Sequence, residues 1–320
     1  MKSALIDYLS PKGHVPIINF YIKNLENYFD TIHLNLKIKK DIINKKKVNF
    51  INFEKNFILR VWRLIKLFLF LKKNKINKVV MLSYEPIDLF FLGVFLNLNY
   101  FKIFIFEHDT LNQKKILRFS LIKFLSRRIV HVVFTPQSKK LLKKKFNRNS
   151  IIVNHPIIQI NYYKENYIKK KIILIPTRHH FNIKLIYNFI NKNSEFYFYI
   201  LSKKSNIRKN LFKNFKKIKL IEFIKSEDIY KITAIYLPLD EDIYRYRISA
   251  WLYNGLAYNK KIILEHNNLY KYEKKRFPNH IILNKNKGFI INNFKVKKKL
   301  NILKYNQILI KDFIKKIFGE

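Results

Sequence analysis

The stretch "KIILIPTRHHFNIKLIYNFI" (171–190) contains the two elements that decide the fold. Residues 172–177 are apolar or nearly so, with the length and β-branched content of a buried strand. The run ends in Arg178 and two histidines, and a helix-like apolar pattern follows Lys184. A strand, a short polar connection and a helix form the repeating unit of parallel α/β sheets.

The same unit recurs along both halves of the chain. Strand-like runs rich in β-branched and aromatic residues occupy 4–9, 31–36, 78–83, 101–108, 129–135, 150–154, 171–177, 196–201, 218–223, 234–239, 261–266 and 280–284. Helix-like stretches separate most of them, which predicts parallel, doubly wound sheets. So many strands exceed one compact sheet, and the polar stretch 159–171 lies between the halves. We therefore predict an α/β fold with two Rossmann-like parallel-sheet domains that face a cleft: residues 1–158, residues 159–302, and a C-terminal helix, 303–320, that packs back on the first domain.

The chain of 320 residues is strongly basic, with 65 Lys and Arg against 21 Asp and Glu and a formal charge of +44. Such a balance attracts polyanions: nucleic acid, anionic lipid headgroups or phosphorylated substrates. The abundance of Lys, Asn and Ile and the presence of only 5 glycines also fit an AT-rich genome. The charge therefore permits anion binding without identifying the anion. The absence of cysteine excludes disulfides and thiolate metal sites.

Membrane segments are not expected, because no uninterrupted apolar run reaches the roughly 20 residues that a span needs. The N-terminal apolar stretch is too short for the h-region of a signal peptide, so we expect the protein in the cytoplasm. A helix predicted at 56–78 carries Arg60, Arg63 and Lys66 along one side among large apolar residues. Two interpretations stay open: a helix lying on anionic lipid, or a core helix whose cations reach out to solvent.

Cationic side chains are expected at the carboxyl end of the strand at 171–177, where doubly wound folds bind their ligands. Arg178 ends this strand and Lys184 enters the next helix, so both can converge on one anion such as a pyrophosphate. Arg is scarcer than Lys in this chain, which favours a specific role for Arg178. The alternative is two further cations in a lysine-rich chain.

The segment "AIYLPLDEDIYRYRISAWLYNGLAYNKKIIL" (234–264) predicts a strand, a loop, a helix and a strand. Ser249 is placed to cap this helix, with Arg247 just before its anion-friendly N-terminus. The loop offers three carboxylates to ribose hydroxyls: Asp240, Glu241 and Asp242. These acids can instead balance local lysines. The Asp-x-Asp spacing is a weak metal motif, and we expect no metal site.

In the first domain, "IFEHDT" places three candidate catalytic side chains at the end of a predicted strand: Glu107, His108 and Asp109. A histidine beside carboxylates at such an edge can act as a base or donate to a sugar hydroxyl. In "SPKGH" (10–14), Gly13 suits a sharp turn or a close backbone approach to a ligand. His14 then lies at a helix N-terminus that faces the cleft. A structural role is the alternative for either histidine.

These motifs together resemble bacterial glycosyltransferases of the GT-B fold, in the group that includes the glycosyltransferase family 4-like enzymes of surface polysaccharides. The likeness covers most of the chain and is diffuse. "ILIPTRHHFNIK" is similar to the family's strand, Arg and later Lys that grip the donor diphosphate, and "FIFEHDT" to an element over the donor sugar. "WLYNGLAYNKKII" looks like the last donor element, although the family's two glutamates are missing and Asn254 stands in the place of the second.

The resemblance implies transfer of a sugar from a nucleotide-sugar donor to a surface-glycan acceptor, such as lipopolysaccharide, capsule or a lipid-linked glycan. The first domain would bind the acceptor and the second the donor, and no cofactor or metal would be needed. The implied catalytic candidates are His108 and His14, with Glu107 and Asp109 as partners. The implied donor-binding residues are Gly13, Arg178, Lys184, Asp240, Glu241, Arg247, Ser249 and Asn254. Retention and inversion both stay open.

The implied partners are the donor, the glycan acceptor and the anionic inner face of the cytoplasmic membrane, with no specific nucleic acid. Two alternatives remain. A non-catalytic basic module would bind nucleic acid or anionic membrane through charge alone, although no nucleic-acid motif is present. A nucleotide-sugar epimerase would share the architecture and need no acceptor.

Overall fold

The computed structural model describes most of the chain: residues 2–9, 14–42, 47–53, 56–108, 111, 116–158, 171–177, 182–201, 212, 216–239, 249–265, 268–284, 296 and 298–320. The chain forms two compact units. Unit 1 combines Met1–Pro156 with Asn306–Glu320, and unit 2 is Ile157–Tyr305. The divisions predicted from the sequence fall after residues 158 and 302.

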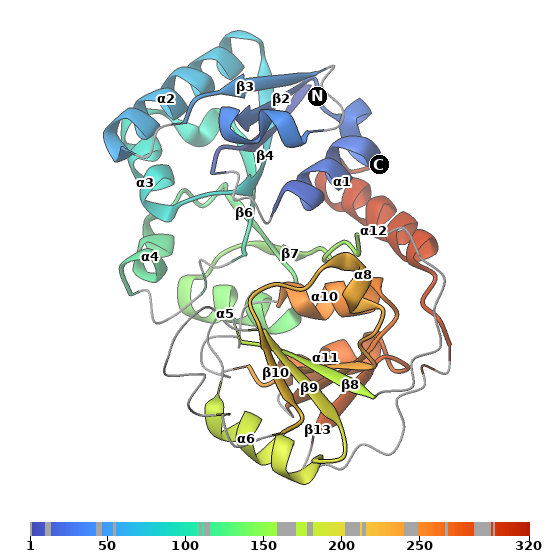
Figure 1. Ribbon diagram of the computed structural model, residues 1–320. Helices are drawn as coiled ribbons and strands as arrows, with labels where there is room; N and C mark the ends of the chain where they lie inside the picture. Colours follow the sequence, from blue (N-terminus) through green and yellow to red (C-terminus); the bar gives the residue numbers. More distant parts are fainter. Residues whose placement is uncertain are drawn as a thin grey trace. The chain divides into compact units, whose positions relative to one another are not determined.

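A seven-stranded parallel sheet with the order β3-β2-β1-β4-β5-β6-β7 forms the centre of unit 1 (Figure 1). Its strands are β1 (Lys2–Asp7), β2 (Thr31–Asn35), β3 (Val48–Ile51), β4 (Ile76–Ser83), β5 (Lys102–Phe106), β6 (Val130–Val133) and β7 (Ser150–Ile152). Its helices and 3-10 helices (η) are α1 (Val15–Leu25), η2 (Glu26–Tyr28), η3 (Leu36–Asp41), α2 (Phe57–Lys73), α3 (Pro86–Phe95), η4 (Leu98–Tyr100), α4 (Ile116–Leu121), η5 (Ile122–Phe124) and α5 (Pro136–Phe146). β1 pairs with both β2 and β4, so the strand order reverses between β1 and β4. Doubly wound sheets bind ligands at the carboxyl ends of the strands at such a switch point.

Unit 2 contains a six-stranded parallel sheet with the order β10-β9-β8-β11-β12-β13. Its strands are β8 (Ile172–Pro176), β9 (Tyr197–Leu201), β10 (Ile218–Ile221), β11 (Ala234–Leu237), β12 (Lys261–Glu265) and β13 (Ile281–Asn284). Its helices are α6 (Ile183–Lys192), α8 (Ser226–Ile229), α10 (Ala250–Ala257) and α11 (Asn268–Arg276). The switch point of this sheet lies between β8 and β11.

Strand β8 is apolar throughout because both of its faces are covered. Ile172 and Leu174 pack into a core that includes α10, on one face of the sheet. Ile173 and Ile175 pack on the other face with apolar side chains of α6. A parallel strand between two helical layers therefore shows a continuous apolar run rather than alternation.

A last helix, α12 (Ile302–Ile317), begins in unit 2, and its residues from Asn306 onward belong to unit 1. Phe313 of this helix is fully buried. Its ring lies 5.3 Å from that of Tyr21 and 6.1 Å from that of Phe106. Aromatic contacts of this kind add to the apolar area that the helix buries.

Two details of the predicted elements are wrong. The short strand β3 was not predicted; its residues are half-buried or exposed, and lysines precede it. The helix predicted at 56–78 ends at Lys73, and β4 begins at Ile76. Lys75, between them, has a positive φ of 59°, which suits the sharp change from helix to strand.

Candidate functional site

Two candidate catalytic histidines from distant parts of the sequence lie together in unit 1. His14 is the N-cap residue of α1, and His108 follows β5 after one residue. Their ring centroids are 4.5 Å apart, and both residues are half-buried. The ring of His108 also lies 5.1 Å from that of Phe134, which follows β6. The helix start and the strand end thus bring two imidazoles within reach of one ligand.

Glu107 is buried at the end of β5 and contacts the strands on both sides. Its Oε1 accepts a hydrogen bond from the hydroxyl of Tyr84 at 2.6 Å and lies 2.5 Å from Nδ1 of His131. Tyr84 follows β4, and His131 belongs to β6. In the sequence, Glu107 is a predicted partner of His108. These contacts hold its carboxylate at the strand end that His108 follows.

A third histidine, His155, extends the pair and was not predicted. Its ring lies 5.4 Å from that of Phe134, which also contacts His108. Its Nδ1 is 2.8 Å from the carbonyl oxygen of Pro156. The available signal was a histidine just after the short strand β7, at the same edge of the sheet as His108.

The two loops with most of the predicted donor-binding residues begin at neighbouring strand ends in unit 2. β8 and β11 are paired, so the segments after them start side by side at the switch point. Thr177 holds the end of β8, because its N–H and its hydroxyl both donate to the carbonyl of Leu201, at 2.8 and 2.9 Å. The N–H of Asn182 donates to the carbonyl of Pro238 at 3.0 Å, which ties the start of α6 to the segment after β11.

Lys184 is exposed in the first turn of α6. Its N–H and that of Leu185 donate to Oδ1 of the N-cap residue Asn182, at 3.1 and 3.3 Å. The cap therefore satisfies two of the amides that a helix N-terminus otherwise offers to anions. The start of α6 thus presents the exposed ammonium of Lys184 next to two amides that are already hydrogen-bonded.

Ser249 occupies the N-cap position of α10, but the predicted side-chain cap is wrong: its hydroxyl makes no capping hydrogen bond. Its backbone is extended (φ −81°, ψ 126°), as N-cap residues are, and its carbonyl accepts the N–H of Leu252 at 3.0 Å. Asn254 is exposed on α10. The side chains of Ser249 and Asn254 thus come from the same helix, near its start and its middle.

The remaining predicted site residues lie outside the described part of the chain: Gly13, Asp109, Arg178, Asp240, Glu241 and Arg247, together with Asp242. Their roles stay predictions.

A polar cluster at the carboxyl edge of the second sheet was not predicted. The hydroxyl of Tyr236 donates to Oε1 of Glu265 at 2.5 Å, and the amide of Asn284 donates to both oxygens of Glu265 at 3.1 and 3.3 Å. The cluster joins β11, β12 and β13. Burial, together with Glu265, raises the pKa of Tyr236, so its hydroxyl keeps its proton. Glu265 is only half-buried. In the sequence, the signal for this cluster is a carboxylate that ends a buried strand.

Within the described part of the chain, no group of three or more His, Cys, Asp or Glu residues is arranged to hold a metal ion. No helix in the same residues has the length and apolar character to span a bilayer.

No family model matches this chain, and no curated protein matches its sequence. Several solved structures resemble it over nearly its whole length. A glycosyltransferase from Rickettsia africae is 14% identical, with a TM-score of 0.59 over 98% of this chain and 89% of that one. HepE of Anabaena, solved in complex with UDP, is 9% identical, with a TM-score of 0.57 over 98% and 91%. A putative UDP-N-acetylglucosamine 2-epimerase from Listeria monocytogenes is 12% identical, with a TM-score of 0.54 over 97% and 88%.

At these identities the likeness shows the fold. The chain consists of two parallel-sheet α/β domains, as in GT-B glycosyltransferases, and this predicted fold class is confirmed.

Proposed function

We propose that this protein is a glycosyltransferase that moves a sugar from a nucleotide-sugar donor to a surface-glycan acceptor such as lipopolysaccharide, capsule or a lipid-linked glycan. The observation that carries the proposal is the pairing of β8 with β11. The loops that contain Arg178 and the acids from Asp240 onward start at the ends of these two strands. The similar HepE structure contains UDP, and the similar Rickettsia protein is named as a glycosyltransferase.

The chemistry requires stabilisation of the negative charge that develops on the leaving nucleoside diphosphate. Arg178 and the exposed ammonium of Lys184 would supply positive charge next to the phosphates, so no metal is needed for this step. Arg247 and the N-terminus of α10, whose N-cap side chain makes no capping bond, would add further donors. Asp240 or Glu241 would bind the ribose.

In unit 1, His108 or His14 would act on the donor sugar or the acceptor hydroxyl. A neutral imidazole can remove a proton from a hydroxyl, and a protonated one can donate to a sugar oxygen. Glu107 would hold the end of β5 in place through Tyr84 and His131, and Asp109 is the remaining candidate partner. Both retaining and inverting transfer are compatible with this arrangement. The enzyme would work in the cytoplasm at the inner face of the membrane.

The test is a thermal-shift and turnover screen against UDP-, GDP-, ADP-, CMP- and dTDP-linked sugars. One nucleotide family should raise the melting temperature, and Arg178→Ala should remove that rise. Within α6 a matched pair is available: Lys184→Ala, at the first turn, should weaken donor binding by about 10-fold, as the loss of one phosphate contact does. Lys192→Ala, at the last turn of the same helix and also exposed, should leave binding unchanged. Equal effects of the two lysine variants would contradict the assignment.

A nucleotide-sugar epimerase is the second candidate, because a putative 2-epimerase is among the similar structures. The two functions separate when the donor is incubated both alone and with a candidate acceptor. An epimerase would convert one sugar nucleotide into another without an acceptor, whereas a transferase would release the nucleotide in proportion to acceptor glycosylated. The basic binding module would show neither, and its salt-sensitive binding to nucleic acid would be unaffected by Arg178→Ala.

A further inference from the structure

Helix α2 is apolar on its buried face and also carries large apolar side chains on its exposed face. The buried face consists of Val61, Leu64, Ile65, Leu67, Phe68 and Leu71. The exposed face carries Ile58, Leu59, Trp62, Leu69 and Phe70, with Trp62 54% exposed. A surface helix ordinarily presents polar residues to water. Apolar side chains clustered outward on one helix therefore indicate a surface that binds something.

The exposed apolar surface continues onto the neighbouring helices. α2, α3 and α4 lie side by side in unit 1 (Figure 1). Ring contacts connect them: Phe57 of α2 lies 5.2 Å from Phe91 of α3, and Phe90 lies 6.3 Å from Phe124 of η5. Phe95 and Phe124 are 62% and 63% exposed. We call the exposed faces of α2, α3, α4 and η5 together the helical face of unit 1.

The charge of the helical face is positive. Its exposed cations include Lys66 and Lys73 of α2 and Lys123 of η5. Nζ of Lys66 lies 5.2 Å from the ring centroid of Trp62, so a cation stands beside an exposed aromatic side chain of this face.

The described carboxylates between residues 57 and 128 are all bound to cationic or histidine side chains. Asp88 pairs with Arg60, Glu85 with Arg118, and Glu107 with His131. Positive charge on this face is therefore left largely uncompensated by acids of the same segment.

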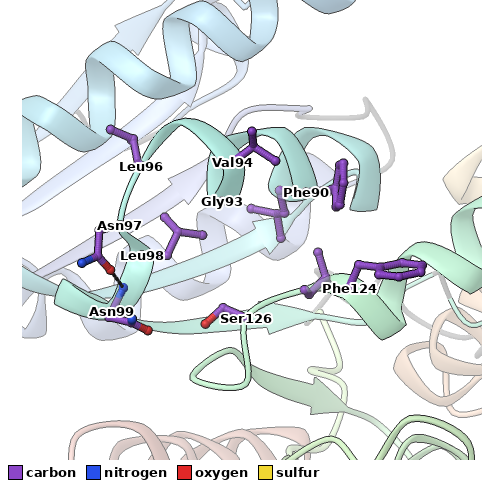
Figure 2. Close-up of a pocket in the computed structure, with 11 residues that line it drawn as sticks. Phe90, Gly93, Val94, Leu96, Asn97, Leu98, Asn99, Phe124 and Ser126 are labelled. Carbon is purple, nitrogen blue, oxygen red and sulfur yellow. Dashed lines mark hydrogen bonds between the residues drawn. The ribbon is translucent and has the colours of Figure 1, made fainter.

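A groove of about 300 Å³ opens beside α3 and η5 and has two chemically different ends (Figure 2). Figure 2 shows the rings of Phe90 and Phe124 at one end, and Asn97 and Asn99 towards the other. At the polar end a guanidinium is held in place, because Arg128 donates to the carbonyl of Asn99. The apolar end has the character that suits a hydrocarbon chain. Arg128 is not part of the groove lining, but through its bond to Asn99 it offers a cation next to the polar end.

We propose that the helical face of unit 1 binds the surface of a bilayer that contains anionic lipid. Trp62, Phe95 and Phe124 enter the boundary between headgroups and acyl chains, and the lysines contact lipid phosphates. Charge complementarity selects this occupant, because a second copy of this chain would present the same positive face and repel it. The groove beside α3 then receives the chain of one lipid. The inference rests on the proposed function, in which the acceptor can be a lipid-linked glycan. It concerns only the binding of the protein to the bilayer.

The experiment measures sedimentation of the full chain with phosphatidylcholine vesicles and with vesicles that also contain phosphatidylglycerol, without any sugar nucleotide. We expect binding only to the anionic vesicles. The double variant Lys66→Glu/Lys73→Glu should bind at least ~10-fold more weakly, since each cation near such a surface contributes appreciably. The control Lys140→Glu/Lys144→Glu makes the same charge change at two exposed lysines of α5 and should bind like the parent. Equal losses in both variants would overturn the proposal in favour of general charge attraction.

Insertion is tested separately through tryptophan fluorescence, because Trp62 and Trp251 are the two tryptophans of the chain. In a Trp251→Phe variant, anionic vesicles should shift the Trp62 emission to the blue, and brominated lipids should quench it. No shift and no quenching would overturn the insertion of α2. A dimer in solution that Trp62→Ser dissociates would overturn the proposal in favour of self-association. Because no sugar nucleotide is present, failure here is distinguishable from failure of the donor-binding test.

Discussion

Asp88 is a fully buried carboxylate that has two partners in unit 1. The guanidinium of Arg60 donates to both of its oxygens at 2.8 Å, and the hydroxyl of Tyr8 donates to Oδ2 at 2.9 Å. The exposed fractions of the Arg60 and Asp88 side chains are 15% and 0%. Burial, and to a lesser degree the negative charge of Asp88, raises the pKa of Tyr8 well above its ordinary value, so Tyr8 remains a hydrogen-bond donor. One carboxylate of α3 thus connects the segment after β1 with the first turns of α2.

Asp88→Ala should lower the free energy of unfolding by about 3–5 kcal/mol, because it removes the partner of a largely buried cation. Urea denaturation at pH 7 would measure the change. The control is Asp228→Ala, which breaks a pair between Asp228 and Lys231 that is exposed on both sides. An exposed pair of this kind contributes about 0–1 kcal/mol. Equal losses in the two variants would mean that burial of the Asp88 pair has no energetic consequence.

Arg60 also shows how far the candidate residues could be predicted. Helical spacing correctly indicates that Arg60 belongs to a helix, but it groups the residue with Arg63 and Lys66 as one row of cations. The acid that binds Arg60 lies 28 positions later in the chain. Periodicity describes neighbours on one helix, whereas ion pairs between elements depend on packing. The same limit applies to Glu107, whose partners Tyr84 and His131 are each more than twenty positions away.

At the scale of elements, α10 lies close against the second sheet at Gly255. A Cβ at this position would lie 3.0 Å from Cδ1 and Cγ1 of Ile262 and 3.1 Å from Cδ1 of Ile235. Both isoleucines are fully buried on neighbouring strands, so they have little room to move. Only glycine at this position therefore lets α10 pack this closely on the sheet. The same helix carries Ser249 and Asn254.

Gly255→Ala should destabilise the protein by about 1–3 kcal/mol through overpacking. Gly93→Ala in α3 is the matched control, because a Cβ there meets only Leu98 Cδ1 at 3.5 Å. The control should be neutral or stabilising by up to about 1 kcal/mol, since alanine favours a helix over glycine. Thermal unfolding of the two variants gives the comparison, and a destabilised control or a neutral Gly255→Ala would contradict this packing account.

The elements themselves were well predicted wherever both faces are buried. Each of the strand-like runs in the sequence corresponds to a strand, because a parallel strand covered by helices needs a continuous apolar segment. β3 was missed although β10, an edge strand with the same pattern of burial, was predicted, so exposure alone does not explain the miss. The order of strands in each sheet was not predicted, since periodicity carries no information about which strands pair.

At the scale of the whole molecule, each unit buries a histidine whose lowered pKa makes that unit less stable in acid. His33 belongs to β2 of unit 1, and burial lowers its pKa from 6.5 to about 4. His280 precedes β13 of unit 2, and burial, assisted by Lys261, lowers its pKa to about 4 as well. His33 is 3.0 Å from the hydroxyl of Thr31, and His280 is 2.8 Å from the side-chain oxygen of Asn259. Both imidazoles are therefore buried in their neutral form.

Stability should fall as the pH drops from about 6.5 towards 4. Above this window both histidines are neutral whether the chain is folded or unfolded, so they add no pH dependence. Within it the unfolded chain binds a proton that the folded chain does not, and the free energy of unfolding falls by about 1.4 kcal/mol per pH unit for each histidine. By pH 5 the loss should be roughly 2 kcal/mol per histidine. Urea unfolding followed between pH 7 and pH 5 measures this slope.

The two units allow the contributions to be separated, because each contains one of these histidines. His33→Asn should flatten the slope for the transition of unit 1 and leave that of unit 2, and His280→Asn should do the reverse. Hydrogen exchange read at β2 and at β13 assigns each transition to its unit, since opening of either sheet exposes its own amides. If both variants kept the parent slope, the pH dependence would come from groups other than these imidazoles. A slope of opposite sign, with stability rising below pH 6.5, would mean that the folded chain binds protons more tightly than the unfolded one, which burial of two neutral imidazoles does not permit.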